Sequence, residues 1–426
     1  MPLREARQTA QSRTTGARWY FVVLVTAAIA ISYFDRQTLP VAISSIERTI
    51  PLSDQQFSWL QFAFLIPYAV MYAAGGRLLD AIGTRRGFLL IMLWWSGACA
   101  LHGLAMNFGF LLVARCLLGM GEGGGFPAAT RVVAEWIPIG RRSTAMGMIN
   151  AGTAAGSVLA PPLIGILLVT SGWRMVFFVS GAAGLGWVAW WYFGYHGSNE
   201  PSLATLDVLA DAQKLSFLDL VSMRPVQVLI FAKFMSDSAW YFYLLWLPKY
   251  LYDARGFDIK QVSYFAWIPY AASGIGSFLG GWFSSALLSR GRSLNFSRKS
   301  VLGLSALFMP VVMLVPHVPV AWALGLFSIA FFCQQSWSGL IMTIPADIFP
   351  LALVGTIAGL VGFGGAIGGA IFGVAAGFLL SRGFGYSTLF LIVGTFHLIG
   401  FCAILIFAGT LRPHKTLDLQ PKVRPI

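Results

Sequence analysis

Four ionisable side chains lie inside two apolar stretches that are each long enough to cross a lipid bilayer. Asp35 and Arg36 are adjacent in the first stretch, and Arg115 precedes Glu122 by seven residues in the second. A charge near the bilayer centre costs about 2.5 kcal/mol or more, so such groups face a protein interior or a water-filled cavity. Guanidinium groups can grip the oxygen pairs of an anion, and carboxyl groups can take up protons. These residue types indicate a site for an anion and for protons.

Helix geometry places the four groups near one depth. At a rise of about 1.5 Å per residue, Arg36 and Arg115 lie at similar distances from one membrane face, and Glu122 lies about two turns deeper than Arg115 on the same helix face. Asp35 is rotated by about 100° from Arg36. Burial favours a protonated carboxyl group, whereas a nearby guanidinium favours the ionised form. We expect Asp35 and Glu122 to occupy the arginines when ionised, and proton uptake to release Arg36 and Arg115 for the anion.

A structural role is the alternative for these residues. The charges could be buried ion pairs that fix helix packing, although a buried pair is weak evidence for stability. The neighbouring Gly119, Gly121 and Gly123–Gly125 allow helices to approach closely. We expect these glycines to serve both packing and access to Glu122.

The composition predicts a membrane protein with many spans. Of the 426 residues, 57% are hydrophobic and 11% are charged, and the mean hydropathy is +0.73. A transmembrane helix needs about 20 apolar residues, and stretches of that length recur along the chain. We predict an all-α polytopic membrane protein with twelve transmembrane helices, at 19–44, 55–80, 87–106, 109–136, 143–170, 173–194, 226–251, 262–288, 300–316, 319–345, 351–380 and 386–410.

Other chemistries find little support in the sequence. The four cysteines fall inside predicted spans and the five histidines lack ligand spacing, so neither a disulfide framework nor a metal site is expected. The formal charge of +13 lacks a basic face interleaved with aromatic residues, which argues against a nucleic-acid partner. We find no nucleophile–base pair of an enzyme. No cofactor is expected, and a proton gradient would supply the driving force.

Basic residues gather in alternate connections, which predicts the orientation. The basic side holds Arg4, Arg7, Arg13, Arg18, Arg77, Arg85, Arg86, Arg141, Arg142, Lys214, Arg224, the Arg290–Lys299 group, Arg412, Lys415, Lys422 and Arg424. The other side holds fewer, namely Arg48, Arg174, Lys249, Arg255, Lys260 and Arg382. The positive-inside rule makes the first side cytoplasmic. We therefore predict a protein of the cell (inner) membrane with both termini in the cytoplasm, whose first apolar run is retained as a helix.

A degenerate repeat divides the chain into two halves. GGRLLDAIGTRR from Gly75 has a counterpart, GGWFSSALLSRGR, from Gly280. We predict an N-terminal six-helix bundle at 1–194, a cytoplasmic linker with a short surface helix at 195–223, and a C-terminal six-helix bundle at 224–426. Two such halves with a binding site between them at the membrane midplane form a recurring transporter architecture.

The first copy of the repeat resembles the loop signature of the major facilitator superfamily. The resemblance rests on Gly75, Asp80, Gly83 and the pair Arg85-Arg86. A carboxylate near a helix N-terminus is favoured by the helix dipole. The resemblance implies that Asp80, Arg85 and Arg86 form a conformational latch on the cytoplasmic side. The alternative is a basic turn that merely follows the membrane topology.

Further segments resemble the anion:cation symporter family, in particular its hexuronate, aldonate and aldarate transporters. They are YFDRQTLPVAI from Tyr33, RCLLGMGEGGGFPAAT from Arg115, FYLLWLPKYL from Phe242, PADIFP from Pro345 and VGTIAGLVGFGGAIGG from Val354. The resemblance implies proton-coupled symport of a sugar acid by alternating access. It also implies that Asp35 and Glu122 are the proton-linked acids, and that Arg36 and Arg115 anchor the anion.

Polar residues elsewhere in the predicted spans are further candidates for substrate binding. They are Tyr68, Asn150, Thr153, Tyr241, Gln334, Gln335 and Ser336, with Lys233, Asp237, Trp240 and Trp337 beside them. Some sugar-acid members of the family carry Gln at the position of Thr153, so its contact with a sugar hydroxyl is open. Interhelical hydrogen bonds are the alternative for each residue. Lys233 lies near the cytoplasmic end of its span and could snorkel to the interface.

Two transport modes fit these residues. A symporter of an organic anion and protons, in the lipid bilayer and monomeric, explains the paired arginines and acids. The alternatives are an exchanger of organic anions, or a symporter of another small carboxylate such as an aromatic or tartrate-like acid. An exchanger of phosphorylated anions would need arginines from both halves. The seventh span offers Lys233 and no arginine, which counts against this alternative.

Overall fold

The computed structural model describes residues 2–195, 215–256 and 267–412, and the elements in these ranges are helices. The first part of the chain holds α1 (Pro2–Glu47), α2 (Asp54–Ile82), α3 (Thr84–Leu101), η1 (His102–Leu104), α4 (Phe108–Glu122), α5 (Gly125–Trp136), η2 (Ile139–Arg141), α6 (Arg142–Ser171) and α7 (Trp173–Gly194). The second part holds α9 (Phe217–Ser222), α10 (Arg224–Arg255), α12 (Trp267–Ser289), α13 (Leu294–Phe308), η3 (Met309–His317), α14 (Val320–Ile348), α15 (Leu351–Ser381) and α16 (Tyr386–Phe407).

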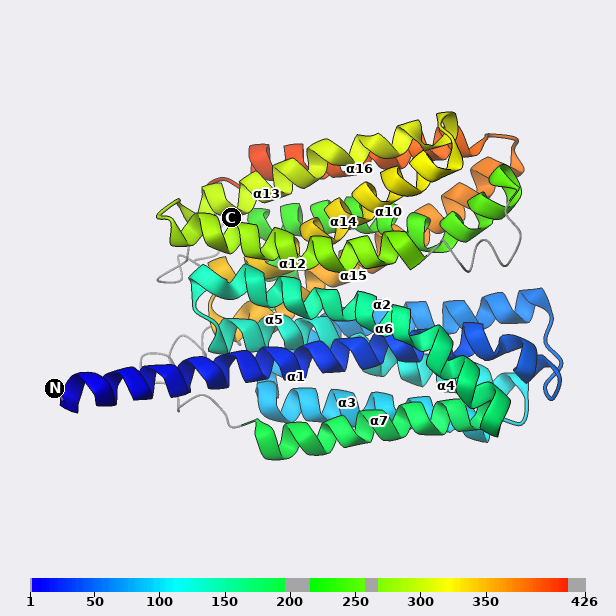
Figure 1. The fold of residues 1–426 in the computed structure, drawn as a ribbon, viewed down its shortest axis with the longest axis horizontal. Coiled ribbons are helices and arrows are strands. Elements are labelled where there is room, and N and C mark those ends of the chain that lie inside the picture. The colour runs from blue at the N-terminus through cyan, green and yellow to red at the C-terminus, as the bar shows by residue number, and fades with distance from the viewer. Residues whose placement is uncertain (1, 196–214, 257–266, 413–426) are drawn as a thin grey trace, which may run out of the picture.

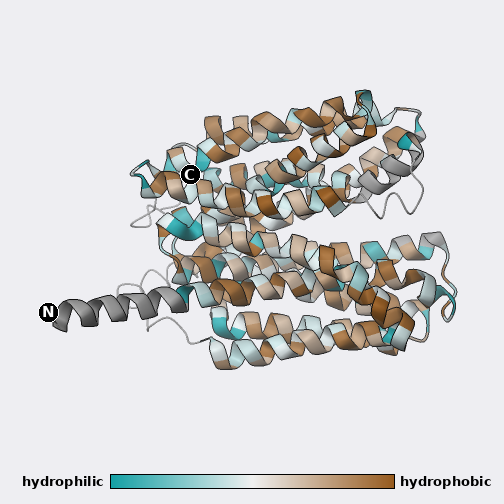
Figure 2. Cartoon of the chain, in the orientation of Figure 1, coloured by the Kyte–Doolittle hydropathy of each residue, from teal (hydrophilic) through white to brown (hydrophobic). Residues whose placement is uncertain are grey.

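The apolar stretches of the sequence form these helices. Nine helical segments in the described ranges are long and apolar enough to cross a membrane. The other three predicted spans are occupied by α4 with α5, by α10 and by α12. Figure 2 shows hydrophobic residues along the lengths of the helices and hydrophilic residues mostly toward their ends. Large apolar side chains such as Val169 and Ile406 are exposed on the outside, as expected for contact with lipid.

The helices form two groups that lie one above the other in Figure 1. Helices α1 to α7 make up the lower group, and α10 to α16 make up the upper group. The groups meet where α2 and α5 pack on α15, and where α6 packs on α12 and α14. Any site between the two groups is therefore lined by these helices and by those directly behind them.

Local sequence explains several helix boundaries. Ser53 caps α2 through a capping box with Gln56, and the Asn107 side chain accepts a hydrogen bond from the backbone N–H of Phe110 at the start of α4. Gly83 adopts φ 81°, a left-handed conformation that suits glycine, and this lets α3 begin directly after α2 ends.

One predicted span is divided into two helices. The stretch 109–136 was expected to be a single helix, but α4 ends at Glu122 and α5 begins at Gly125. The glycines allow α4 to press against its neighbours, because a Cβ at Gly119 would meet the Phe64 carbonyl oxygen and one at Gly121 would meet Trp95. Glu122 is the last residue of α4, and Gly123 and Gly124 separate it from α5.

Other boundaries also differ from the predictions. Helix α1 begins at Pro2, well before the predicted residue 19, and the span predicted at 300–316 continues from α13 into the 3₁₀ helix η3. Of the predicted linker, residues 196–214 lie outside the described part of the chain, and the rest contains α9. Helix ends depend on caps and packing, so the apolar pattern locates each helix better than it locates the ends.

Candidate functional site

The structure brings Arg36 and Glu122 together from α1 and α4. Arg36 Nε donates a hydrogen bond to Glu122 Oε2 at 2.7 Å, and the Ser32 hydroxyl donates to the same oxygen at 2.6 Å. The guanidinium lies 4.5 Å from the ring centroids of both Tyr33 and Tyr68. Glu122 is 2% exposed. The arginine is therefore held by one carboxylate and two aromatic faces.

Arg115 lies behind this pair. It is 1% exposed, and the Phe64 ring centroid is 5.7 Å from its guanidinium carbon and 5.4 Å from that of Arg36. Its Nε and Nη2 have no hydrogen-bond partner among the described residues, and neither has Glu122 Oε1. Arg115 lies outside both sets of cavity-lining residues given below. Its role as a direct anchor for an anion stays a prediction.

Asp35 pairs with neither Arg36 nor Arg115, which corrects our expectation. It is fully buried, and Trp95 Nε1 donates to its Oδ2 at 2.7 Å while the Ser180 hydroxyl donates to its Oδ1. The reason is the rotation of about 100° between adjacent helical residues. That rotation turns Asp35 toward α3 and α7, whereas Arg36 faces α4.

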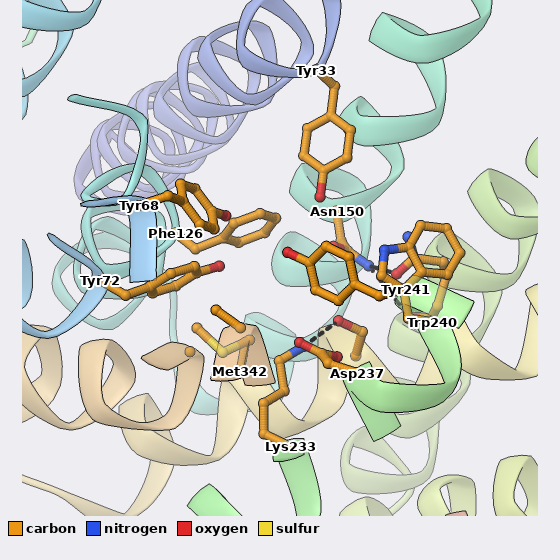
Figure 3. A pocket seen from close by; sticks show the side chains of 14 residues that line it. Tyr33, Tyr68, Tyr72, Phe126, Asn150, Lys233, Asp237, Trp240, Tyr241 and Met342 are labelled. Atoms are coloured by element: carbon orange, nitrogen blue, oxygen red, sulfur yellow. Dashed lines mark hydrogen bonds and ion pairs between the residues drawn. The ribbon is translucent and has the colours of Figure 1, made fainter. Parts of the chain in front are cut away.

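One cavity lies between the helix groups, and we call it the Lys233 cavity (Figure 3). Its walls are Tyr33, Tyr68, Tyr72, Phe126, Asn150, Lys233, Asp237, Trp240, Tyr241, Gln335, Ser338, Met342, Gly362 and Ala366. Four of the predicted binding residues are therefore in its wall, namely Tyr68, Asn150, Tyr241 and Gln335. Asn150 Nδ2 donates to Gln335 Oε1 at 2.8 Å, which joins α6 to α14.

A second cavity contains Arg36, and we call it the Arg36 cavity. Its walls are Tyr33, Arg36, Gln37, Thr153, Ala154, Ser157, Trp240, Tyr241, Leu244, Tyr270 and Ser273. The predicted residue Thr153 is in this wall, and its hydroxyl donates to the Asn150 carbonyl at 2.8 Å. Tyr33, Trp240 and Tyr241 line both cavities. The two cavities are neighbours with a shared aromatic wall.

Besides Arg115, two predicted binding residues lie outside both cavity walls. Gln334 is 1% exposed, and the Ser336 hydroxyl donates to the Gly276 carbonyl at 2.6 Å. On α14 these two residues flank Gln335. Of these three consecutive polar residues, Gln335 lines the Lys233 cavity. Ser336 serves the packing of α12 on α14, and a binding role for either residue stays a prediction.

Lys233 points into the protein, so the alternative that it snorkels to the interface does not apply. Lys233 and Asp237 are 5% and 8% exposed. Lys233 Nζ donates to Asp237 Oδ1 and to Ser338 Oγ, each at 2.9 Å. Figure 3 shows the hydroxyl groups of Tyr33, Tyr72 and Tyr241 directed toward the space above this pair. The cavity therefore has a charged pair from the second group of helices.

One end of the interface between the groups is closed by Asp80. Asp80 accepts hydrogen bonds from Arg131 on α5 and, on α15, from the backbone N–H and the hydroxyl of Thr356 at 2.7 and 2.6 Å. The predicted partners Arg85 and Arg86 do not take part. Arg85 donates to the Tyr192 carbonyl at 3.2 Å, and Arg86 is exposed. Both lie at the start of α3, which contacts other helices of its own group rather than α15.

A second charged cluster closes the same end, and the sequence reasoning missed it. Arg298 is fully buried, and its Nε donates to Asp347 Oδ2 at 2.8 Å while its Nη1 donates to the Ser143 hydroxyl at 2.8 Å. Arg142 lies 3.7 Å from Asp347 Oδ1. The available signal was an acid within the apolar segment PADIFP, together with arginines we had assigned only to topology.

Helices that enclose charge-lined cavities, with one end of the interface closed by ion pairs, define a membrane transporter. The chain belongs to the major facilitator superfamily, whose model matches residues 25–373. It is 30% identical to the hexuronate transporter of Escherichia coli strain K12 over 405 residues, which are 90% of this chain and 92% of that protein. It is 31% identical to the galacturonate transporter of Dickeya chrysanthemi, over 69% of this chain and 89% of that protein.

Other relatives and solved structures agree with this assignment. The chain is 31% identical to a probable sulfoacetate transporter of Cupriavidus necator, over 91% of this chain and 92% of that one. A solved proton:xylose symporter matches with a TM-score of 0.76 at 15% identity, covering 94% of this chain and 97% of that chain. The resemblance to hexuronate and aldarate transporters is confirmed, and the protein is an integral multi-pass membrane transporter rather than an enzyme.

Proposed function

We propose that the protein is a proton-coupled symporter that imports an organic anion, namely a sugar acid such as a hexuronate, aldonate or aldarate. The observation that carries the proposal is Arg36, which lines a cavity between the helix groups while Glu122 holds its Nε at 2.7 Å. The named substrates of the relatives, hexuronate, galacturonate and galactarate/glucarate, support the class of anion.

Glu122 and the substrate would compete for Arg36. Glu122 occupies the Nε edge of the guanidinium, and the Arg36 side chain keeps 18% exposure. A carboxylate in the Arg36 cavity can therefore approach the terminal nitrogens, which present two N–H donors in a planar fork. Protonation of Glu122 would remove its charge from the pair and strengthen the hold of Arg36 on the anion. Proton and anion would then be bound together.

Asp35 would contribute through α1. Its carboxylate ties α1 to Trp95 on α3 and Ser180 on α7, and Arg36 is the next residue. A proton on Asp35 would weaken these bonds to the carboxylate and change how α1 sits against α3 and α7. Arg115, with unpartnered donors behind Phe64, would stabilise negative charge at the same level.

The transport cycle we propose is alternating access between two six-helix bundles with twelve spans, at 1–194 and 224–426. The basic connections make the end closed by Asp80 and Asp347 cytoplasmic. In that orientation the present arrangement is closed to the cytoplasm, and breaking the contacts of Asp80 and Asp347 would open it. The protein would act as a monomer in the inner membrane with both termini cytoplasmic, and without a cofactor.

Uptake into proteoliposomes with an imposed pH gradient tests this function. We would offer labelled glucuronate, galacturonate, galactonate and glucarate with the outside acidic, and clamp the membrane potential with valinomycin and potassium. Accumulation above the outside concentration that collapses with a protonophore is the expected result. Equal uptake with and without the pH gradient would rule out proton coupling.

An organic-anion exchanger is the second candidate. Lys233 in the wall of the Lys233 cavity favours it, because an exchanger of charged substrates benefits from cations supplied by both helix groups. The same vesicles separate the two modes. Exchange requires an anion inside the vesicle and ignores the pH gradient, whereas symport needs the gradient and no internal anion.

A further inference from the structure

Lys233 and Asp237 form a charged pair that packing alone does not explain. They are one helical turn apart on α10, both are buried, and Nζ lies 2.9 Å from Oδ1. On a helix surface such a pair contributes little to stability. Burial removes both ions from water, and the attraction between them offsets this desolvation cost only in part. A pair held at this cost in the wall of a cavity suggests a ligand.

The lysine can bind one more acceptor. An ammonium group has three N–H donors, and two of them reach Asp237 Oδ1 and Ser338 Oγ. Among the described residues these are its hydrogen-bond partners. Because Lys233 also lines the Lys233 cavity, its third donor is available to an acceptor there.

Each of the two neighbouring cavities has one cationic side chain in its wall. Arg36 lines one cavity and Lys233 lines the other, while Tyr33, Trp240 and Tyr241 line both. A ligand that extends along this shared wall would meet a guanidinium at one end and an ammonium at the other. The wall of the Lys233 cavity also includes Tyr241 and the Asn150–Gln335 pair, whose polar groups can bind hydroxyl groups.

We propose that Lys233 is a second anion anchor, so that the preferred substrate carries two acidic groups, one bound at Arg36 and the other at Lys233. Asp237 neutralises Lys233 until the second acidic group replaces it as a partner. This inference rests on the proposed transport of organic acids. It narrows the substrate to diacids with hydroxyl groups between their ends.

Binding of matched acids to the purified full-length protein tests the proposal. D-Gluconate and D-glucarate differ only at one end, which is a primary alcohol in the first and a carboxylate in the second. Galactonate and galactarate form a second such pair. By calorimetry at one pH and salt concentration, the protein should bind a diacid about tenfold to a hundredfold tighter than its matched monoacid.

Variants then assign this preference to Lys233. Lys233→Gln should lose about tenfold or more of its diacid affinity and change its monoacid affinity less than about threefold. Lys233→Arg should retain the preference. Lys299→Gln removes a lysine charge outside both cavity walls, where Nζ donates to the Gly409 carbonyl, and should leave both affinities unchanged.

A variant that retains the lysine guards against misfolding. Asp237→Asn keeps the side-chain shape and removes the carboxylate that competes for Lys233, so diacid binding should tighten several-fold. Equal loss of both affinities in Lys233→Gln, or a wild-type preference for the monoacid, would overturn the inference and leave organic-acid transport standing. If the protein neither binds nor transports any of these acids, the proposed function fails as well.

Discussion

Three aromatic rings and one carboxylate surround the guanidinium of Arg36. Tyr33 and Tyr68 each lie 4.5 Å from its guanidinium, Phe64 lies at 5.4 Å, and Glu122 accepts from its Nε. A guanidinium between aromatic rings gains cation–π attraction and loses conformational freedom before any ligand arrives. The guanidinium is therefore held in place, and its terminal N–H groups can bind an anion in the Arg36 cavity.

Replacing Arg36 by Lys should weaken anion binding while keeping the charge. Lysine has no planar fork and stacks poorly between Tyr33 and Tyr68, so we expect a loss of about tenfold or more, or about 1.4 kcal/mol. Calorimetric titration with the best-bound sugar acid measures the change. Arg290→Lys, at an exposed position, is the matched control. Wild-type affinity in the Arg36 variant would contradict its role as anchor.

Replacing Asp35 by Asn should uncouple transport from protons. Asparagine fits the space between Trp95 and Ser180 but cannot take up a proton at neutral pH. We expect accumulation of labelled substrate against its gradient to disappear, while exchange of internal for external substrate persists. Glu47→Gln, at the exposed end of the same helix, should retain accumulation. Proton-driven accumulation in the Asp35 variant would show that this carboxyl is not an obligatory proton carrier.

At the level of helices, the division between α4 and α5 positions the acid of the site. Glycines bring α4 against α2 and α3, since Cβ atoms at Gly119, Gly121 and Gly123 would meet Phe64, Trp95 and the Tyr68 carbonyl. Phe64 and Tyr68 are the same residues whose rings face Arg36. Close packing of α4 on α2 therefore also sets the walls around the guanidinium.

Gly119→Ala should destabilise the protein and weaken binding together. The added methyl group would push against the Phe64 backbone, and overpacking of this kind costs about 1–3 kcal/mol. Gly97→Ala on α3 is the control, because a Cβ there has no neighbour within 4 Å, and alanine favours a helix by about 0.5–1 kcal/mol over glycine. Thermal unfolding in detergent compares the two. Equal midpoint temperatures of unfolding in the two variants would mean that α4 can move away from α2 without a loss of stability.

At the level of the whole molecule, the two helix groups are joined at one end by buried charge. Asp80 reaches from α2 to α15, and Arg298 with Asp347 reaches the Ser143 hydroxyl on α6. Removing one partner of a buried ion pair costs about 3–5 kcal/mol, because the other charge is left uncompensated. Contacts of this strength can hold one state of a transporter and still be exchanged for others during a cycle.

A disulfide across this closed end should stop transport. The hydroxyl oxygens of Ser143 on α6 and Ser285 on α12 are 2.8 Å apart, which suits a bridge between cysteines placed there. We expect Ser143→Cys combined with Ser285→Cys, with Cys116 and Cys402 changed to Ser, to crosslink under oxidation and to lose uptake. Reductant should restore uptake, and each single cysteine variant should be indifferent to oxidant. Full transport by the crosslinked protein would exclude opening at this end.

The class of protein and its intramembrane charges can be predicted from the chain alone. Length and apolarity over about 20 residues are local properties, so the positions of the membrane spans follow from the chain directly. Charges inside such spans must face a protected interior, which is why Arg36 and Glu122 were found without coordinates. Motif resemblance led to the superfamily for the same reason, since it depends on residue order alone.

The partners of these residues depend on how the helices pack. A helix pattern leaves open how each helix is rotated against its neighbours, and one residue of difference turns a side chain by about 100°. This rotation sends Asp35 to Trp95 and Ser180, and Lys233 into a cavity. The contacts that close one end of the interface involve Arg131 and Arg298, and not Arg85 and Arg86. Arg131 reaches a residue more than two hundred positions along the chain, and Arg298 reaches one about fifty positions along. Such pairings exist only once the helices have packed.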